Sequence, residues 1–382
     1  MDFVSLSDGT LGERRVALTP TVTKRLVDLG ANVRLEPGYG AEADLSDALY
    51  EKAGATFASR DELLASADAL LSLNPPEAST LRELRDGTIV ISFFDPFRRQ
   101  ELVRTARDGG LSALCLELVP RTSYAQKMDA LSSQASLGGY AAVITAADRS
   151  GKSFPMMSTP AGTIPPARVF VVGVGVAGLQ AIATAKRLGA RVDAYDTRPV
   201  VAEQVRSLGA KFVELDVGET GQTEQGYAKE LTAEQLAEQR RQMAKVVAGA
   251  DVVITTAQLF GRPAPRIVDA AMVAGMRPGS VIVDMAASTG GNVEGSVPDE
   301  EVVVDGVRIV GLSNLPGLVA RDASEMYASN LFALIQHAWD TEASTLKLDP
   351  ENDDVVDGCL LTHRGTVRDE RVAAVLEEGS SA

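Results

Sequence analysis

Cysteine and histidine are scarce in this chain of 382 residues. It has two cysteines, Cys115 and Cys359, and two histidines, His337 and His363. Two distant cysteines without a C-x-x-C spacing argue against a disulfide-stapled scaffold and against a structural zinc site. Neither histidine lies in a recognisable catalytic setting. We therefore expect no metal site and no histidine that serves as a general acid or base.

Excess positive charge and long apolar runs are also missing. The chain holds 37 Lys and Arg against 52 Asp and Glu, for a formal net charge of −15. Such an acidic chain is a poor direct partner for nucleic acid or for an anionic membrane surface. The first ten residues lack the basic and apolar regions of a signal peptide, and the apolar run Ala141–Ala147 is far shorter than a membrane span. We expect a soluble, cytoplasmic protein without direct membrane insertion.

A strand–turn–helix–strand pattern is present near the middle of the chain. The β-branched run Val169–Val172 leads into a G-x-G-x-x-G at Gly173–Gly178. Helix formers follow at Leu179–Leu188, and Arg191–Tyr195 forms a second strand. A glycine-rich turn between a strand and a helix is typical of dinucleotide binding. The sequence therefore predicts a Rossmann-type nucleotide site here.

The three glycines of this turn have separate expected roles. Gly173 permits the tight turn out of the strand, Gly175 lets the backbone approach the pyrophosphate, and Gly178 lets the helix pack close to the strand. Val176 and Ala177 open the helix, whose free N–H groups and positive dipole end favour phosphate. All five are predicted to bind the cofactor.

An acidic residue ends the second strand of the pattern. Asp196 lies about 20 residues after the first glycine, where a carboxylate accepts hydrogen bonds from a ribose 2′-OH. The same charge repels a 2′-phosphate, so the pattern predicts NAD(H) rather than NADP(H). Thr197 and Arg198 follow directly and are included in the predicted site. An arginine can accommodate a 2′-phosphate, but we expect the charge of Asp196 to dominate.

The remaining pattern predicts an α/β protein with two domains. In residues 1–120, strands and helices alternate as in a parallel, doubly wound sheet. The strands expected there are Asp2–Leu6, Asn32–Leu35, Ala69–Leu73, Thr88–Phe94 and Leu111–Val119. The helices expected there are Pro20–Leu29, Ser46–Ala53, Arg60–Ser66 and Arg98–Asp108. A second doubly wound pattern follows the glycine-rich turn, and residues 151–167, with four prolines, are expected to form an extended connector without an element of its own.

We therefore expect two doubly wound, Rossmann-like domains with parallel sheets, joined by long helices, with the cofactor in the interdomain cleft. Residues 1–130 and 325–382 would form the first domain, because a helix at Ala323–Asp340 leads out of the second. Residues 131–324 would form the NAD(H)-binding domain.

Two polar segments interrupt the alternation and allow two interpretations each. The segment Arg121–Asp129 precedes a long helix, Ala130–Asp148, and either lines a cleft or carries ordinary surface charges. Residues 217–232 contain a single aromatic, Tyr227, and form either a solvated loop or a mobile lid over the cofactor.

Four segments carry a family resemblance that covers essentially the whole chain. They are ERRVALTP at Glu13–Pro20, RTSYAQKMDALSSQASLGGYAAV at Arg121–Val143, the block Phe154–Ala190, and GYAKE at Gly226–Glu230. Together they resemble the NAD(H)-binding alpha component of proton-translocating transhydrogenase. The same superfamily contains alanine dehydrogenase, with which ERRVALTP is shared.

The resemblance implies direct hydride transfer between NAD(H) on this chain and NADP(H) on a partner component. It further implies a membrane-spanning proton-channel component, a homodimer of this chain, and a cytoplasmic position at the periphery of the inner membrane. The nicotinamide end of NAD(H) would be held and oriented by Arg121, Gln126, Asp129 and Ser132. Ser133 would line the same site, Tyr227 would fold over the cofactor, and Ala257 and Gln258 would lie near the adenosine.

Alanine dehydrogenase is the main alternative. Its pattern places a lysine and a histidine at the substrate carbonyl, where this sequence has Asn74 and Asp95, although Arg15 is kept. Direct hydride transfer between two nicotinamides moves no proton and needs neither group, which favours transhydrogenase. A non-catalytic NAD(H)-binding regulator and a saccharopine- or lysine-type dehydrogenase remain further alternatives. The sequence departs from the family pattern at Tyr124, where arginine is commoner, and at Ser288-Thr289, which replaces an acidic position.

Overall fold

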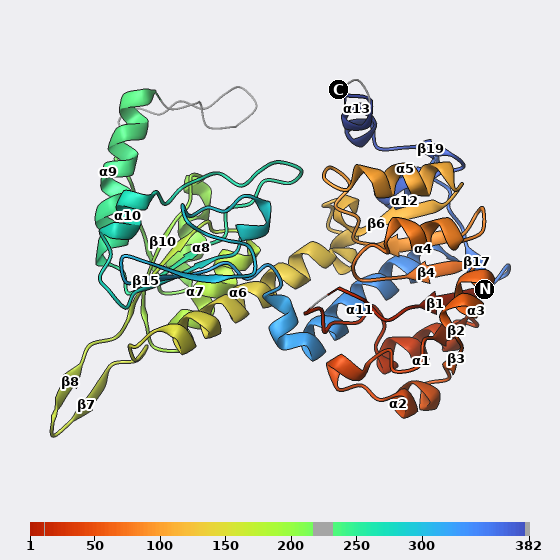
Figure 1. Ribbon diagram of the computed structural model, residues 1–382, viewed down its shortest axis with the longest axis horizontal. Coiled ribbons are helices and arrows are strands. Elements are labelled where there is room, and N and C mark those ends of the chain that lie inside the picture. Colours follow the sequence, from red (N-terminus) through yellow and green to blue (C-terminus); the bar gives the residue numbers. More distant parts are fainter. Residues whose placement is uncertain (11, 217–231, 379–382) are drawn as a thin grey trace. The chain divides into compact units, whose positions relative to one another are not determined.

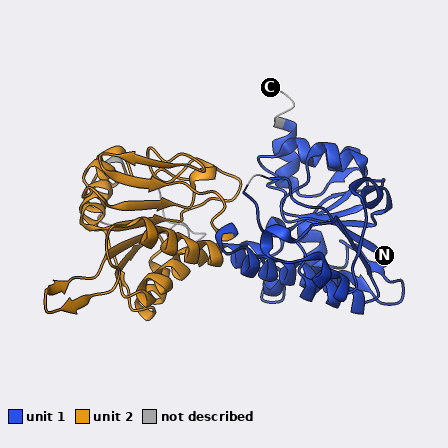
Figure 2. Cartoon of the chain, turned by 60° about the horizontal axis from the view of Figure 1, so that its bottom comes forward, with its two compact units in different colours: residues 1–134, 317–382 blue, residues 135–316 orange. Residues whose placement is uncertain are grey.

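Two sheets organise the computed structural model, which describes residues 1–10, 12–216 and 232–378. Each sheet belongs to its own compact unit (Figure 2). Unit 1 comprises residues 1–134 and 317–382, and unit 2 comprises residues 135–316. The chain passes from unit 1 into unit 2 within helix α6 (Ala130–Arg149), and it returns just before helix α11 (Ala320–Ala338).

The sheet of unit 1 has the strand order β19-β18-β6-β5-β4-β1-β2-β3 (Figure 1). Its strands are β1 (Asp2–Ser5), β2 (Asn32–Leu35), β3 (Thr56–Phe57), β4 (Ala69–Leu71), β5 (Ile89–Ser92), β6 (Ser112–Cys115), β18 (Leu360–His363) and β19 (Thr366–Val367). The pairs from β6 to β3 are parallel, whereas β18 pairs antiparallel with both β6 and β19. The C-terminal segment therefore completes this sheet at one edge.

Helices cover both faces of the unit 1 sheet, because alternate residues of a strand point to opposite sides. Phe3 of β1 lies in one apolar core and Val4 lies in another. The first core also receives side chains from α1 (Pro20–Asp28), α2 (Asp47–Lys52), α11 and α12 (Asp354–Cys359). The second receives side chains from α3 (Arg60–Ser66), α4 (Ala78–Glu83), α5 (Gln100–Asp108) and α13 (Glu370–Glu378).

The sheet of unit 2 has the order β11-β10-β9-β12-β13-β15-β14. Its strands are β9 (Arg168–Val172), β10 (Arg191–Tyr195), β11 (Lys211–Phe212), β12 (Val252–Thr255), β13 (Val281–Asp284), β14 (Glu301–Val304) and β15 (Val307–Val310). All pairs are parallel except that of β14 with β15, at the edge. Strand β9 lies between β10 and β12, so consecutive strands leave it in opposite directions.

Two apolar cores also cover the faces of the unit 2 sheet. Val169 and Val171 of β9 lie in a core with side chains of α6, α7 (Val176–Arg187) and α8 (Ala202–Ser207). Phe170 and Val172 face a core with α9 (Ala233–Gly249) and α10 (Ala270–Ala274). Gly139 of α6 explains one close approach, because a Cβ there would stand 2.1 Å from the Ala177 carbonyl oxygen.

The α/β class with two Rossmann-like sheets is confirmed, with antiparallel strands at the sheet edges as a refinement. Two local expectations were wrong. The strand expected at Leu111–Val119 ends at Cys115 and continues as a 3-10 turn, Leu116–Leu118. The expected connector 151–167 contains an exposed hairpin of β7 (Met157–Thr159) and β8 (Gly162–Ile164). Its strands fall between the four prolines and make no apolar pattern for the sequence to show.

Candidate functional site

The glycine-rich turn lies at the carboxyl edge of the unit 2 sheet, between β9 and α7. This is the point where the connections from β9 and β12 diverge, which is the usual ligand position in open parallel sheets. Gly173 has φ +95°, a left-handed conformation that favours glycine. Gly175 stands immediately before α7, so the first N–H groups of the helix face the same edge.

The glycines differ in the space around them. A Cβ at Gly178 would stand 1.9 Å from the Gly173 carbonyl oxygen, and a Cβ at Gly173 would stand 2.6 Å from Thr256 Oγ1. A Cβ at Gly175 would meet no heavy atom of the described chain within 4 Å. Gly173 and Gly178 are thus required by the fold, whereas Gly175 leaves an open backbone surface that a ligand could approach.

The Asp196 carboxylate is held at the turn by four donors. Its Oδ2 accepts the Val174 N–H at 2.7 Å, and its Oδ1 accepts the Arg198 N–H at 2.8 Å. The Arg198 guanidinium adds bonds from Nε to Oδ1 and from Nη2 to Oδ2, each 3.0 Å. Burial acts to raise the pKa of the Asp196 carboxyl, but the hydrogen bonds from Arg198 and Val174 outweigh it and hold the pKa below its usual value.

The loop that follows β12 is clamped by a buried amide. Asn292 Oδ1 accepts the Ala257 N–H at 3.0 Å, and Asn292 Nδ2 donates to the carbonyl oxygens of Ala257 and Pro265, both at 2.8 Å. Gln258 Nε2 donates to the Met285 carbonyl oxygen. The sequence did not reveal the role of Asn292. Its only signal there was an asparagine after two glycines, and its partners lie 35 and 27 positions away.

Unit 2 therefore brings together, at one sheet edge, most of the residues predicted to bind the cofactor. The turn, Asp196 with Arg198, and the Ala257–Gln258 backbone follow the adjacent strands β9, β10 and β12. Thr197 is exposed beside Asp196, and Val176 and Ala177 open α7. Tyr227 lies outside the described residues. Thr289, at one departure from the family pattern, donates to the Ala286 carbonyl oxygen within a 3-10 turn, Ala287–Thr289.

The second predicted group lies in unit 1, where residues 121–129, hereafter loop 121–129, precede α6. The loop contains a 3-10 helix, Ala125–Met128, in which Ala125 and Met128 are buried in the core. Arg121 and Gln126 are exposed, and no hydrogen bond of either side chain is found among the described residues. Their side chains are therefore open to a ligand.

Asp129 has a clear structural task. Its Oδ1 accepts the Ser132 N–H at 2.9 Å and its Oδ2 accepts the Ser132 hydroxyl at 2.6 Å, which caps the start of α6. Ser133 Oγ donates to Asn330 Oδ1 at 2.7 Å. Unit 1 thus gathers the side chains predicted to handle the nicotinamide, and it fixes Asp129 and both serines more firmly than Arg121 and Gln126.

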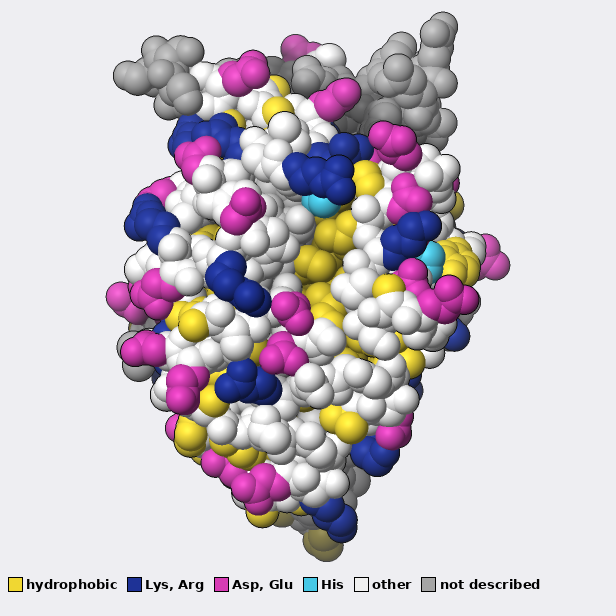
Figure 3. Space-filling view, turned by 90° about the vertical axis from the view of Figure 1, so that its right-hand side faces the viewer, with side chains coloured by type: hydrophobic (Ala, Val, Ile, Leu, Met, Phe, Trp, Pro, Cys, Tyr) yellow, Lys and Arg dark blue, Asp and Glu magenta, His cyan; other side chains and the backbone are white. Residues whose placement is uncertain are grey.

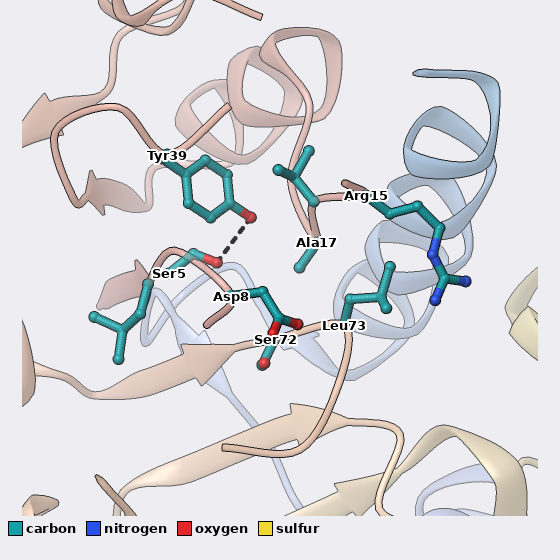
Figure 4. Close-up of a pocket in the computed structure, with 9 residues that line it drawn as sticks. Ser5, Asp8, Arg15, Ala17, Tyr39, Ser72 and Leu73 are labelled. Carbon is teal, nitrogen blue, oxygen red and sulfur yellow. Dashed lines mark hydrogen bonds between the residues drawn. The ribbon is translucent and has the colours of Figure 1, made fainter. Parts of the chain in front are cut away.

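A small pocket opens elsewhere in unit 1, and its lining includes Asp8, Arg15, Tyr39 and Ser72 (Figure 4). Tyr39 and Ser5 are joined there by a hydrogen bond of 2.9 Å. Burial raises the pKa of Tyr39 to about 12, so its hydroxyl keeps its proton at neutral pH. The pocket contains Arg15, which the alanine dehydrogenase alternative would use to bind a carboxylate.

Donors of Arg15 are already engaged by the chain. Nε and Nη2 donate to the two Glu13 carboxylate oxygens at 2.8 and 2.6 Å, and Nη1 donates to Gln134 Oε1 at 2.8 Å. Asn74 Nδ2, at the expected lysine position, donates to Asp8 Oδ2 and Glu13 Oε2. Burial acts to raise the pKa of Glu13, yet Arg15 and Asn74 hold it below its usual value. These contacts support a structural role for Arg15.

Charges are spread over the surface. On the face shown in Figure 3, acidic and basic side chains are interspersed rather than gathered by sign. Among the residues that the structure describes, every helix is too short or too polar to cross a membrane. Within the same described residues, no three His, Cys, Asp or Glu side chains are grouped so that they could hold a metal ion.

Comparisons with known proteins agree on one family. The description "Alanine dehydrogenase/PNT, N-terminal domain" matches residues 9–138, and "Alanine dehydrogenase/PNT, C-terminal domain" matches residues 142–370. An NAD(P) transhydrogenase alpha subunit of Rickettsia prowazekii is 42% identical, over 96% of this chain and 96% of that protein.

A crystal structure of transhydrogenase from Sinorhizobium meliloti superposes with a TM-score of 0.86 at 42% identity, covering 96% of this chain and 99% of that one. Alanine dehydrogenase of Mycobacterium tuberculosis is more distant, at 28% identity over 95% of this chain and 94% of that protein. The chain therefore belongs to the alanine dehydrogenase/PNT family, among the alpha subunits of NAD(P) transhydrogenase.

Proposed function

We propose that the chain binds NAD(H) at the carboxyl edge of the unit 2 sheet. The observation that carries this proposal is the bond from the Val174 N–H to Asp196 Oδ2, which fixes a carboxylate beside the open backbone of Gly175. The pyrophosphate would lie on Gly175 and the first turn of α7, where free N–H groups favour anions. Asp196 would accept the ribose hydroxyls and repel a 2′-phosphate.

The bound NAD(H) would exchange hydride directly with NADP(H) on a partner component. A hydride leaves C4 of one dihydronicotinamide with both bonding electrons and bonds to C4 of the other nicotinamide, so one ring is oxidised and the other reduced. No proton is released or taken up at the rings. A site that lacks a histidine acid or base is suited to this reaction, because catalysis then depends on distance and orientation.

Loop 121–129 would orient the nicotinamide. Arg121 and Gln126 offer exposed donor groups for the carboxamide or the facing ring. Asp129 and Ser132 would act from a fixed position at the start of α6, because each is bonded to the other. None of these residues would transfer a proton. Ser133 and Tyr227 would complete the site, and closure over the rings would exclude water.

The relatives' names describe a subunit of a larger enzyme, and we extend this to the partners of the chain. They would be an NADP(H)-binding component, a membrane-spanning component that conducts protons, and a second copy of this chain. The chain itself would lie in the cytoplasm, attached to the inner membrane through those partners. Proton movement would be coupled to transfer on the partner components.

Amino-acid dehydrogenase activity is the second candidate, and the retained Arg15 is the observation in its favour. Against it, Asn74 cannot titrate and is bonded to two carboxylates of the chain. Asp95 pairs with Arg98 at 3.6 Å and would repel a carboxylate substrate. A regulator that only binds NAD(H) would bind NADH normally and never turn it over.

The test uses the purified chain with a purified NADP(H)-binding component and, separately, the chain alone. Reduction of an NAD⁺ analogue by NADPH that requires both proteins supports the proposal. Oxidation of NADH by the chain alone with pyruvate and ammonium, without transfer in the mixture, would replace it with the dehydrogenase. NADH binding with neither activity would favour the regulator.

A further inference from the structure

Loop 121–129 has few hydrogen bonds of its own. Its 3-10 helix spans only four residues, a form with poorer hydrogen-bond geometry than an α-helix. The Asp129 N–H donates to the Gln126 carbonyl oxygen at 3.3 Å, and the Ala125 N–H donates to Thr122 Oγ1 at 3.3 Å. Buried Ala125 and Met128 anchor its apolar side. The orientation of its polar side therefore depends on contacts with neighbouring elements.

One such contact is made by Asn330, in the middle of α11. Asn330 Nδ2 donates to the Lys127 carbonyl oxygen at 2.8 Å, and Asn330 Oδ1 accepts the Ser133 hydroxyl at 2.7 Å. A single side chain thus holds the backbone next to Gln126 and the first turn of α6, on either side of Asp129.

A second contact is made by His337, two helical turns further along α11. His337 Nδ1 lies 3.1 Å from the Tyr124 hydroxyl, and the two rings meet edge to face with centroids 5.4 Å apart. His337 Nε2 lies 3.0 Å from Asp353 Oδ1. Asp353 is itself fixed, because the same oxygen accepts the N–H groups of Val355 and Val356 at the start of α12. The imidazole is therefore held from both sides.

We propose that Asn330 and His337 are positioning residues for hydride transfer, with Tyr124 as the partner of His337 on the loop. This inference rests on the proposed function. The two α11 side chains fix the loop backbone at Tyr124 and Lys127, on both sides of Gln126, and so set where the Gln126 and Asp129 side chains point. Transfer between two rings depends steeply on position, so the contacts govern the rate of transfer. NAD(H) affinity depends chiefly on the distant residues 173–198.

The experiment compares Tyr124→Phe, Asn330→Ala and a control, Gln336→Ala, in the intact chain with its NADP(H)-binding partner. Gln336 is exposed on the same helix and has no hydrogen bond among the described residues. Tyr124→Phe removes only the hydroxyl of a side chain that is 68% exposed, so folding is safe. We expect kcat to fall about tenfold in both test variants, with the KM for NADH and the thermal midpoint unchanged in Tyr124→Phe. The control should match the wild type.

Two further measurements separate the possible failures. Adding His337→Gln to Tyr124→Phe should lower kcat no further than either change alone, because both remove one contact. Amide hydrogen exchange at residues 125–129 in the chain alone should be faster in Tyr124→Phe and Asn330→Ala. Transfer by the wild type with unchanged kcat in both variants would overturn this inference alone. A wild type without transfer would overturn the proposed function and, with it, any role of α11 in transfer.

Discussion

Gly178 lies directly against Gly173, so that a Cβ on Gly178 would stand 1.9 Å from the Gly173 carbonyl oxygen. Gly175, between them, has open space on the same side. The three glycines of one motif therefore have different physical reasons to be glycine, and substitution should separate them.

Gly175→Ala should leave folding intact and weaken NADH binding. Its φ of −84° suits alanine, and the added methyl group meets no atom of the described chain. Gly178→Ala should instead destabilise the fold by about 1–3 kcal/mol, because the helix must move away from the strand. Thermal unfolding and NADH titration of both variants check this. Equal loss of stability in the two would contradict the distinction.

Asp196→Ala should weaken NADH binding about 10- to 100-fold, the range expected for losing hydrogen bonds to a charged group. It should also narrow the preference for NADH over NADPH. Isothermal titration with both nucleotides measures this, with Glu203→Gln, an exposed carboxylate on α8, as the matched loss of charge. An unchanged preference in Asp196→Ala would remove Asp196 from the ribose site.

Arg198→Ala should shift the acid limit of NAD⁺ binding to higher pH. The Asp196 carboxyl has a folded pKa below the unfolded value, so the pairing stabilises the fold above about pH 4 and this contribution disappears as the pH falls through the folded pKa. Removing the guanidinium lets burial raise that pKa, and the carboxylate is then protonated at a higher pH. NAD⁺ affinity measured from about pH 4 to 7 checks this. Coincident profiles for variant and wild type would refute it.

Asp129→Asn should lower hydride transfer while NADH binding stays within about threefold. Asparagine caps a helix as well as aspartate does, so α6 keeps its start. Asp129→Ala removes the cap and should cost a further loss of stability of about 1 kcal/mol. Steady-state transfer and thermal unfolding distinguish the charge from the cap. Wild-type transfer in Asp129→Asn would leave this residue with its structural task only.

The sequence was most informative where structure is local. The bounds of β10 and α3 match the expected ones, because each depends on a short run of neighbouring residues and on clear stop signals. The glycine spacing likewise predicted the turn at the carboxyl edge of β9. The sequence also favoured transhydrogenase over alanine dehydrogenase at Asn74 and Asp95, through the chemistry that these side chains lack.

Features that depend on distant partners were not predictable. Asn292 acts on Ala257 and Pro265, and no local pattern marks that contact. The pairing of Tyr124 with His337 joins positions 213 residues apart. Strand β3 has two residues, too few to show a period. The hairpin β7–β8 was missed because prolines and exposed polar residues outweigh its strand signal.

Direct hydride transfer is the central claim, and isotope labelling tests it most directly. Unlabelled NADPH would reduce an NAD⁺ analogue in D₂O, in the presence of this chain and its NADP(H)-binding partner. The account predicts a reduced analogue without deuterium at C4, and a rate that requires both proteins. Deuterium at C4, or reduction that proceeds without this chain, would contradict it.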